Sequence, residues 1–233
     1  ASNTTWNQLT SLSLKKNEIG NKGASGIGKN AAWTNLQNLD LSCNKIGDQG
    51  AIAIGLNSIW SQLTCLHLEE NEIGDQGAVG LSENATWEIL HELHLNGNKI
   101  GDIGAMAIGA SKAWKRLKGL YLSDNKIGDK GAVAIGNNKT WCSLSILDIS
   151  RNKISDKGAI SLGSNTTWTD LYCLRLEENE IGNKGAVAIG NNMAWVALGK
   201  LYLNGNKIGE EGVLSIANNA TWSNLEELRI YDN

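Results

Sequence analysis

A tryptophan recurs every 27 residues along the whole chain. The positions are Trp6, Trp33, Trp60, Trp87, Trp114, Trp141, Trp168, Trp195 and Trp222. A fixed period of roughly 20–50 residues indicates a stacked repeat array, in which each unit buries its apolar face only against its neighbours. Residues 1–233 are therefore predicted to form a single array. It has eight full 27-residue repeats from Trp6 and a terminal strand at 222–233, with no separate caps.

Within each repeat the apolar residues first follow a period of two. Counted from the tryptophan, Leu stands at plus three and plus six in all nine repeats, and Leu or Ile stands at plus eight. This alternation is typical of a short strand with one buried face, and strands separated by a helix pair in parallel. An Asn at plus eleven, from Asn17 to Asn233, fits a buried turn residue whose side-chain amide bonds the backbone of adjoining coils.

The second half of each repeat predicts a short helix. Asp or Asn stands at plus fifteen in most repeats, as at Asp129, and is a preferred cap for a helix N-terminus. Ala132 and Ile135 follow three residues apart and lie on one helical face. Gly136 and Asn137 are suited to a left-handed stop at the helix C-terminus.

The combined pattern LxxLxLxxNxIGxxGAxxI, which Leu117–Ile135 illustrates, resembles the leucine-rich repeat family over the whole chain. Its IGxxGA segment is similar to the ribonuclease-inhibitor-like subclass, and especially to the GALA type of bacterial effectors. The resemblance implies an α/β leucine-rich-repeat solenoid, a horseshoe or arc with a parallel β-sheet on the concave face and short helices on the convex face. The 27-residue length and the tryptophan are atypical of that subclass.

Charge and cysteine content narrow the environment of the chain. The net charge is −3, and positive and negative residues are mixed along the chain. The sequence contains no basic block, so nucleic-acid binding is not predicted. No apolar run reaches the roughly 18 residues of a membrane span. Cys65 and Cys173 share a column four repeats apart, too far for a disulfide, and Cys43 and Cys142 have no close partner in register. Four free thiols without a visible signal peptide favour a cytoplasmic location.

The positions that vary between repeats lie on one face of the predicted sheet. Residues at plus five, seven and nine alternate with the buried leucines and point away from the core. Solvated positions also drift without function, but variable Tyr, Arg, His and Asp on a fixed frame are typical of a recognition surface. The predicted partner-binding residues are Asp40, His67, Glu69, Glu92, His94, Tyr121, Asp148, Arg175, Glu177, Tyr202 and Arg229.

Some of these residues recur after 108 residues, which is four repeats. Cys65 matches Cys173 and Asp40 matches Asp148, and the segment LEENEIG occurs at 68–74 and again at 176–182. The array is therefore predicted to have grown by copying blocks of four repeats. The copied acidic clusters would attract a basic partner and raise its rate of association.

We predict a non-enzymatic module that binds a protein partner through the concave face and needs no cofactor. No nucleophile elbow is visible, and the glycines recur once per helix, as packing requires, and do not form phosphate loops. One alternative is a structural array that self-associates end to end through exposed Leu225, Leu228 and Ile230, or a fragment of a larger sensor or effector. Another is a glycan-binding surface built from exposed indoles.

A metal site is not predicted, although two histidines come close to forming one. His67 and His94 are expected on adjacent strands, with Cys65, Glu69 and Glu92 nearby, and could share a transition metal. No helical or loop spacing enforces ligand geometry, and the site would be shallow. The simpler interpretation is two exposed histidines in a binding column.

The tryptophan column and the Asn three residues before it have structural interpretations. Nine exposed indoles would form a large apolar patch, so we predict that they are buried. The Asn-x-Thr sequons fall in one column and are Asn3, Asn84, Asn138, Asn165 and Asn219. Asn30, Asn57 and Asn192 share that column without the threonine, so a turn or helix-stop role explains it without glycans.

Overall fold

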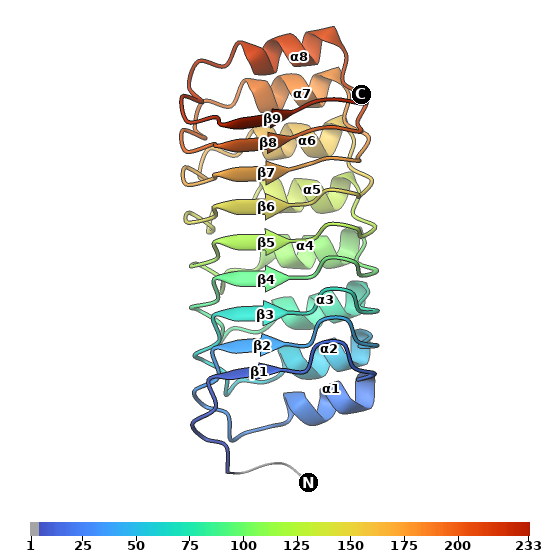
Figure 1. Ribbon diagram of the computed structural model, residues 1–233, viewed down its shortest axis with the longest axis vertical. Helices are drawn as coiled ribbons and strands as arrows, with labels where there is room; N and C mark the ends of the chain where they lie inside the picture. The colour runs from blue at the N-terminus through green and yellow to red at the C-terminus, as the bar shows by residue number, and fades with distance from the viewer. Residues whose placement is uncertain (1–4) are drawn as a thin grey trace.

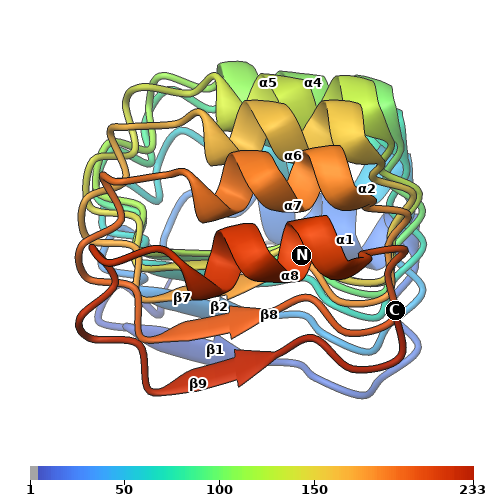
Figure 2. The same ribbon diagram turned by 90° about the horizontal axis from the view of Figure 1, so that it is seen from above.

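The computed structural model describes residues 5–233, which form a single stack of repeats (Figure 1). Nine strands form one parallel sheet in chain order. The strands are β1 (Ser11–Ser13), β2 (Asn38–Asp40), β3 (Cys65–His67), β4 (Glu92–His94), β5 (Gly119–Tyr121), β6 (Ile146–Asp148), β7 (Cys173–Arg175), β8 (Lys200–Tyr202) and β9 (Glu227–Arg229). The helices are α1 (Asn21–Gly28), α2 (Asp48–Gly55), α3 (Asp75–Ser82), α4 (Asp102–Ala110), α5 (Asp129–Gly136), α6 (Asp156–Gly163), α7 (Asn183–Gly190) and α8 (Glu210–Ala217). Strands and helices form two separate layers (Figure 2).

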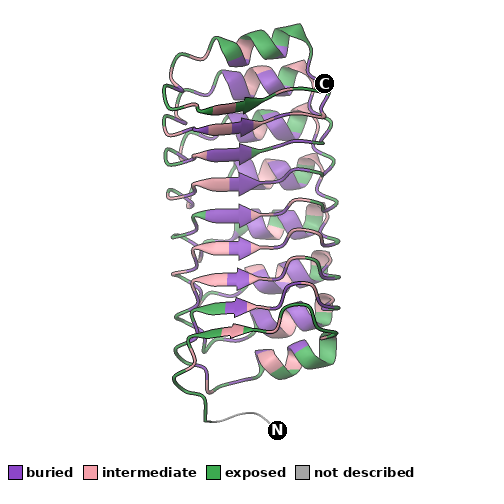
Figure 3. Cartoon of the chain, viewed as in Figure 1, coloured by how far each residue is buried: buried purple, intermediate pink, exposed green. Residues whose placement is uncertain are grey.

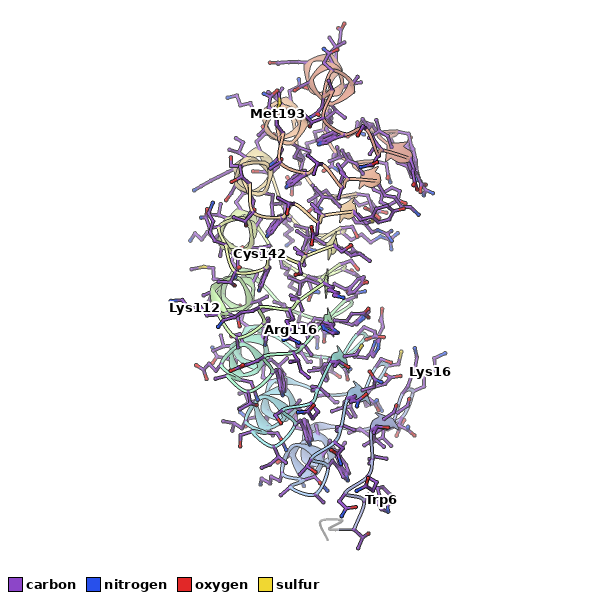
Figure 4. All side chains as sticks on the ribbon, turned by 90° about the vertical axis from the view of Figure 1, so that its left-hand side faces the viewer. Trp6, Lys16, Lys112, Arg116, Cys142 and Met193 are labelled. Carbon is purple, nitrogen blue, oxygen red and sulfur yellow. The ribbon has the colours of Figure 1, made fainter. Side chains whose placement is uncertain are left out.

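Adjacent strands pair with an offset of one repeat. Leu66 in β3 pairs with Leu39 on one side and Leu93 on the other, and the same register holds across the sheet. The sheet follows the inner side of a gentle arc and the helices follow its outer side (Figure 4). The predicted solenoid, with a concave parallel sheet and convex helices, is therefore confirmed.

The hydrophobic core lies between the two layers (Figure 3). Leu120, Ile127, Ala132 and Trp114 are each fully buried, and the equivalent residues of the other inner repeats are buried too. The predicted burial of the tryptophans is confirmed for eight of the nine. Trp6 in the first repeat is 54% exposed, whereas Trp222 in the last is 6% exposed, so it is the preceding repeat that buries each indole. Buried indoles cannot stack on sugar rings, so the glycan-binding platform is ruled out for those eight residues.

Two columns of asparagine amides tie each coil to the preceding one. At plus eleven, Asn125 Nδ2 donates to Leu95 O and Leu122 O, both at 3.0 Å, and its Oδ1 accepts from Ile100 N at 2.9 Å. In the column before the tryptophan, Asn138 Nδ2 donates to Gly109 O at 2.8 Å. The predicted Asn ladder is confirmed, and the sequon column is a second buried ladder. Asn3 lies outside the described residues.

The turn after each strand contains a left-handed residue that the sequence analysis did not predict. At plus ten, seven non-glycine residues, among them Lys16, Glu70 and Asp124, and two glycines, Gly97 and Gly205, have φ between 52° and 68°. Non-glycine side chains rarely adopt this conformation. The left-handed residue lies between the paired strand and the ladder Asn at plus eleven. Because these two flanking features impose its conformation, the type of residue at plus ten can vary.

The helix N-termini are capped by the preceding repeat, which corrects the predicted cap. Asp129 is the first residue of α5 and does not cap its own helix. Its Oδ1 instead accepts from the backbone N–H groups of Ser155 and Gly158, both at 2.9 Å, at the start of α6. Asn183 makes the same two contacts with Gly209 and Gly212. The side chain caps a helix N-terminus as predicted, but the helix that it caps is that of the next repeat.

The predicted left-handed stop at the helix C-terminus is wrong. Asn137 follows α5 with φ −85° and ψ −6°, which is right-handed. Gly136 is instead required for close packing, because a Cβ there would lie 2.7 Å from the backbone carbon of Ser161 in α6. The helices are eight or nine residues long. Within residues 5–233, no helix combines the length and apolar character needed to cross a bilayer.

The inter-repeat cap gives a prediction about acid stability. Burial opposes ionisation of Asp129, but hydrogen bonds from the Ser155 hydroxyl and from the backbone of Ser155 and Gly158 outweigh it and lower its pKa below the ordinary 3.8. A lowered folded-state pKa stabilises the fold above that value and loses the contribution as pH falls. We expect Asp129→Ala to cost about 1 kcal/mol at pH 7.

Asp129→Asn is the matched control, because Asn183 shows that an amide oxygen can make both contacts. We expect it to cost less than alanine, and to cost less at pH 3 than at pH 7. Urea unfolding of both variants and the parent at the two pH values measures this. A cost close to zero for Asp129→Ala at both pH values would show that the cap contributes nothing.

Candidate functional site

In-register pairing brings the variable residues into three parallel columns on the concave face. His67 pairs directly with His94, and Tyr121 pairs directly with Asp148. The middle residue of each strand from β2 to β8 is a buried Leu, so the flanking positions must face outward. The structure therefore brings the predicted partner-binding residues into two groups of contacting side chains, one on β3–β5 and one on β6–β9.

The first group is centred on an aromatic stack formed by His67, His94 and Tyr121. Both successive ring centroids, from His67 to His94 and from His94 to Tyr121, are 4.2 Å apart. Gly119 in β5 makes room for the last ring, because a Cβ there would lie 2.8 Å from Tyr121 Cε2. Glycine at one variable position thus fixes how the tyrosine two residues later lies on the sheet.

The two stacked histidines have opposite ionisation tendencies. Hydrogen bonding to Cys65 and then to Glu69 raises the pKa of His67 to about 10. Burial is the largest cause that lowers the pKa of His94, and the charge on His67 adds to it. Burial raises the pKa of Tyr121 to about 12. At neutral pH the stack therefore consists of one cationic ring and two neutral rings.

Sulfur and carboxylate groups surround the two histidines. Cys65 Sγ lies 3.1 Å from His67 Nε2, and Glu92 Oε2 lies 3.1 Å from His94 Nε2. Cys65 Sγ is also 3.7 Å from Glu92 Oε2, so the two pairs touch. On the far side of its ring, His67 Nδ1 lies 3.5 Å from Glu69 Oε1. These side chains are half-buried and come from β3, β4 and the turn after β3.

The second group is an Arg–Tyr–Arg cluster formed by Arg175, Tyr202 and Arg229. The two guanidinium carbons lie 5.3 Å and 5.0 Å from the centroid of the Tyr202 ring, one on each neighbouring strand. Arg175 is held in place by Glu177, whose Oε1 accepts from Nε at 2.9 Å, and by Asp148 at 3.8 Å. Both carboxylates are almost fully buried.

A hollow of about 500 Å³ lies over this second group. It is lined by the five predicted residues on β6–β9 and the turn after β7, which are Asp148, Arg175, Glu177, Tyr202 and Arg229, together with residues of the turns that follow the strands. Burial, followed by a hydrogen bond to Glu227, raises the pKa of Tyr202 to about 12, so its hydroxyl stays protonated. The hollow therefore brings two tyrosine rings, three arginines and five carboxylates together in one place.

Asp40 is the predicted site residue that joins neither group. Its Oδ1 accepts from the Ser42 hydroxyl at 2.6 Å and its Oδ2 accepts from the Ser13 hydroxyl at 3.1 Å. Asp148, four repeats later, makes the same bond to the Ser150 hydroxyl at 2.7 Å. These aspartates therefore fix their own turns.

Sequence reasoning left two residues out of its site although the structure places them there. Cys65 touches His67 and Glu92, and Glu227 accepts from the Tyr202 hydroxyl at 2.6 Å and from Arg229 Nε at 2.8 Å. Both stand at plus five, beside the central column. The alternation of the strand already placed them on the concave face, and only their side-chain contacts were missing.

Eight segments of the chain match the family model described as Leucine Rich repeat, and together they cover more than half of its residues. The matched segments are 7–28, 34–55, 62–82, 89–109, 117–136, 142–163, 169–190 and 198–217. The chain belongs to the leucine-rich repeat family. Each matched segment contains a strand and the following helix, so the leucine-rich repeats coincide with the structural repeats.

Three solved structures share this leucine-rich repeat fold. Internalin C2 from Listeria monocytogenes is 21% identical with a TM-score of 0.65 and covers 95% of this chain and 80% of its own. A plant ice-binding protein is 22% identical with a TM-score of 0.60, covering 97% of this chain and 64% of its own. Listeria monocytogenes InlP is 16% identical with a TM-score of 0.65, and the match covers 96% of this chain and 56% of InlP. At these identities the likeness shows the fold alone, and no curated protein sequence matches the chain.

Proposed function

We propose that this leucine-rich repeat array binds a protein partner non-covalently through its concave face and catalyses no reaction. The observation that carries the proposal is the hollow over the Arg–Tyr–Arg cluster, where five independently predicted residues meet. Tyr and Arg are the residues that contribute most often to binding hot spots. Here Arg175 is held by two buried carboxylates, and Tyr202 and Arg229 are held by Glu227, so little side-chain entropy is lost on binding.

The aromatic stack extends the same surface toward the N-terminal half. Tyr121 lies beside Asp148 in the pairing of β5 with β6, so it joins the stack to the Arg–Tyr–Arg cluster. The resulting column runs through rings and guanidinium groups, with the Asp148 carboxylate between Tyr121 and Arg175. Such a surface suits an extended or convex protein segment that carries apolar and charged residues of both signs.

Affinity capture with paired variants tests the proposal. Tyr121→Ala combined with Arg175→Ala removes one anchor from each group, whereas Met106→Ala combined with Lys130→Ala removes one apolar and one cationic side chain from α4 and α5 on the convex side. Loss of a hot-spot residue costs about 2 kcal/mol or more, or roughly 30-fold in affinity. We expect the concave variant to lose the partners of the parent and the convex variant to retain them.

Quantitative binding then measures the affinity of each captured protein for the three forms. Equal affinity for the parent and the concave variant would refute the proposal, as would selective loss in the convex variant. Circular dichroism checks that both variants keep the helical content of the parent.

End-to-end self-association is a second candidate, because Trp6 in the first repeat is 54% exposed and Leu228 in the last strand is 41% exposed. Light scattering over a range of concentrations separates the two functions. A mass that rises with concentration favours end stacking, and a constant monomer mass favours the concave-face proposal.

We also infer that the repeats belong to the ribonuclease-inhibitor-like subclass and its GALA type. The IGxxGA segment supports this assignment, as does the regular helix on the convex side of all eight repeats. The Gly and Ala of that segment lie where helix packs on helix. A Cβ on Gly131 would be 2.7 Å from the Ala105 Cβ of the preceding repeat.

A further inference from the structure

The residues around the aromatic stack include four side chains with metal-ligating atoms. Cys65 and His67 come from β3, and Glu92 and His94 come from β4, in a register that pairs Cys65 with Glu92 and His67 with His94. The four positions form the corners of a square on one face of the sheet. No local spacing in the sequence brings these residues together, but the pairing of β3 with β4 does.

Ligand atoms of three of these residues already lie close enough together for a single ion, and the Glu92 carboxylate lies beside two of them. The distances are 3.1 Å from Cys65 Sγ to His67 Nε2, 3.7 Å from Cys65 Sγ to Glu92 Oε2, and 3.1 Å from Glu92 Oε2 to His94 Nε2. Ligand atoms of Cys65, His67 and His94 all lie within 4.8 Å of one another. Tetrahedral zinc, with bonds of about 2.0–2.3 Å, places its ligand atoms about 3.3–3.8 Å apart.

The kind of ligand selects the kind of metal. One thiolate, two imidazoles and one carboxylate suit zinc, whereas magnesium and calcium prefer oxygen ligands throughout. We propose that Cys65, His67, Glu92 and His94 bind one zinc ion as a closed four-ligand site on the concave face. The zinc ion would tie β3 to β4 through their side chains, and the two stacked imidazole rings would turn so that both ring planes point toward it.

Glu69 has the position of an outer-shell partner. Its Oε1 lies 3.5 Å from His67 Nδ1, on the side of the ring opposite the Nε2 that faces Cys65. A carboxylate in this place fixes the tautomer of a zinc-bound histidine and raises its basicity. The second oxygen, Glu69 Oε2, is buried and has no hydrogen-bond partner within the described part of the chain. Two carboxylates and one thiolate also provide the negative charge that a divalent cation requires.

The chain contains an internal comparison for this site. The equivalents of Cys65 and Glu69 four repeats later are Cys173 and Glu177, but both histidines and Glu92 are replaced. Arg175, Tyr202 and Lys200 stand in their places, and none of these is a usual zinc ligand. The copied block therefore keeps one thiol in the same structural position without the other ligands, which makes Cys173→Ser a matched control for Cys65→Ser.

Metal titration of the reduced, metal-free protein tests the proposal. The parent protein carries Cys43→Ser and Cys142→Ser, so that only the two compared thiols are present. We expect one equivalent of Zn²⁺ by calorimetry, and a thiolate-to-metal absorption band with Co²⁺ that Zn²⁺ abolishes. Cys65→Ser and His94→Gln should each lower zinc affinity by at least about 100-fold, and Glu69→Gln by about 10- to 100-fold. Cys173→Ser should leave the zinc affinity unchanged.

Alkylation followed by mass spectrometry adds a readout that does not depend on the variants. Zn²⁺ should protect Cys65 from a maleimide, and added chelator should remove the protection. Absence of stoichiometric uptake at tens of micromolar Zn²⁺, or equal affinity of the parent and Cys65→Ser, would overturn the proposal. Loss of binding in Cys173→Ser to the same degree as in Cys65→Ser would also overturn it. Circular dichroism in chelator confirms that each variant is folded.

Discussion

Replacing Trp114 with alanine is expected to lower the free energy of unfolding by about 3–5 kcal/mol. The indole is fully buried between the sheet and the helices, in the middle of the array. Alanine removes the apolar surface and leaves a cavity that neighbouring repeats cannot fill, because their strands and helices are fixed by the same ladders. Chemical denaturation followed by circular dichroism measures the change.

Trp6→Ala is the matched control for this substitution. Trp6 occupies the same column but is 54% exposed, so less apolar surface is lost and no closed cavity forms. We expect its cost to be about 1 kcal/mol. If both substitutions cost the same, the tryptophan column would not derive its effect from burial.

The array architecture predicts how the loss appears as well as its size. Each repeat contacts only its neighbours, so stability is close to a sum of repeat and interface contributions. A cavity at Trp114 weakens the interfaces of one central repeat and should divide the unfolding transition into two. Hydrogen exchange should rise first in α4 and α5, and Trp6→Ala should leave a single transition.

Most of the fold was predictable because its determinants are local and repeated. The Leu-x-Leu alternation gives the strand, and the 27-residue spacing then gives the register of all nine strands. The Asn at plus eleven was correctly assigned to a ladder because a buried amide in an invariant position needs backbone partners. Periodicity therefore converts a local pattern into a three-dimensional contact, since residues one repeat apart become lateral neighbours.

The errors concern contacts that cross between repeats. Asp129 was assigned to its own helix because capping rules describe isolated helices, whereas stacking places its carboxylate beside the next one. Gly136 was assigned to a turn because glycine often stops helices, whereas here the next helix leaves no room for a Cβ. Both residue types were understood correctly, but their partners lie in the following coil.

The sequence predicted which residues face outward and which of them are neighbours on adjacent strands, but not their detailed side-chain contacts. Alternation along each strand identified which residues face outward, and register identified which are neighbours. The contact of Cys65 with its direct strand partner Glu92, and the diagonal contact of Tyr202 with Glu227, depend on side-chain length and rotamer, which the pattern does not specify. The rings of His67 and His94 were therefore expected close together, but the 3.1 Å contact of His67 with the Cys65 thiol was not.

Replacing Asn125 with alanine is expected to lower the free energy of unfolding by about 3 kcal/mol or more, through loss of hydrogen bonds and not of apolar surface. Asn125 Nδ2 donates to three carbonyls, of Leu95, Leu122 and Ser123, and its Oδ1 accepts from Ile100 N. Each buried backbone group left without a partner costs about 1–3 kcal/mol. Asn137→Ala is the control, because Asn137 is an exposed residue outside both ladders, and it should cost less than about 0.5 kcal/mol.

Asn125→Asp separates the hydrogen-bond explanation from one based on side-chain volume. Aspartate has nearly the same shape and keeps the acceptor for Ile100, but its carboxylate would face the carbonyl oxygens that now accept from Nδ2. We expect it to be at least as destabilising as alanine at pH 7, because it adds a buried charge without a donor. Protonation supplies one O–H donor, so its deficit relative to the parent should shrink as pH falls toward 4. A deficit for Asn125→Asp close to zero at pH 7 would mean that the ladder holds the coils by shape alone.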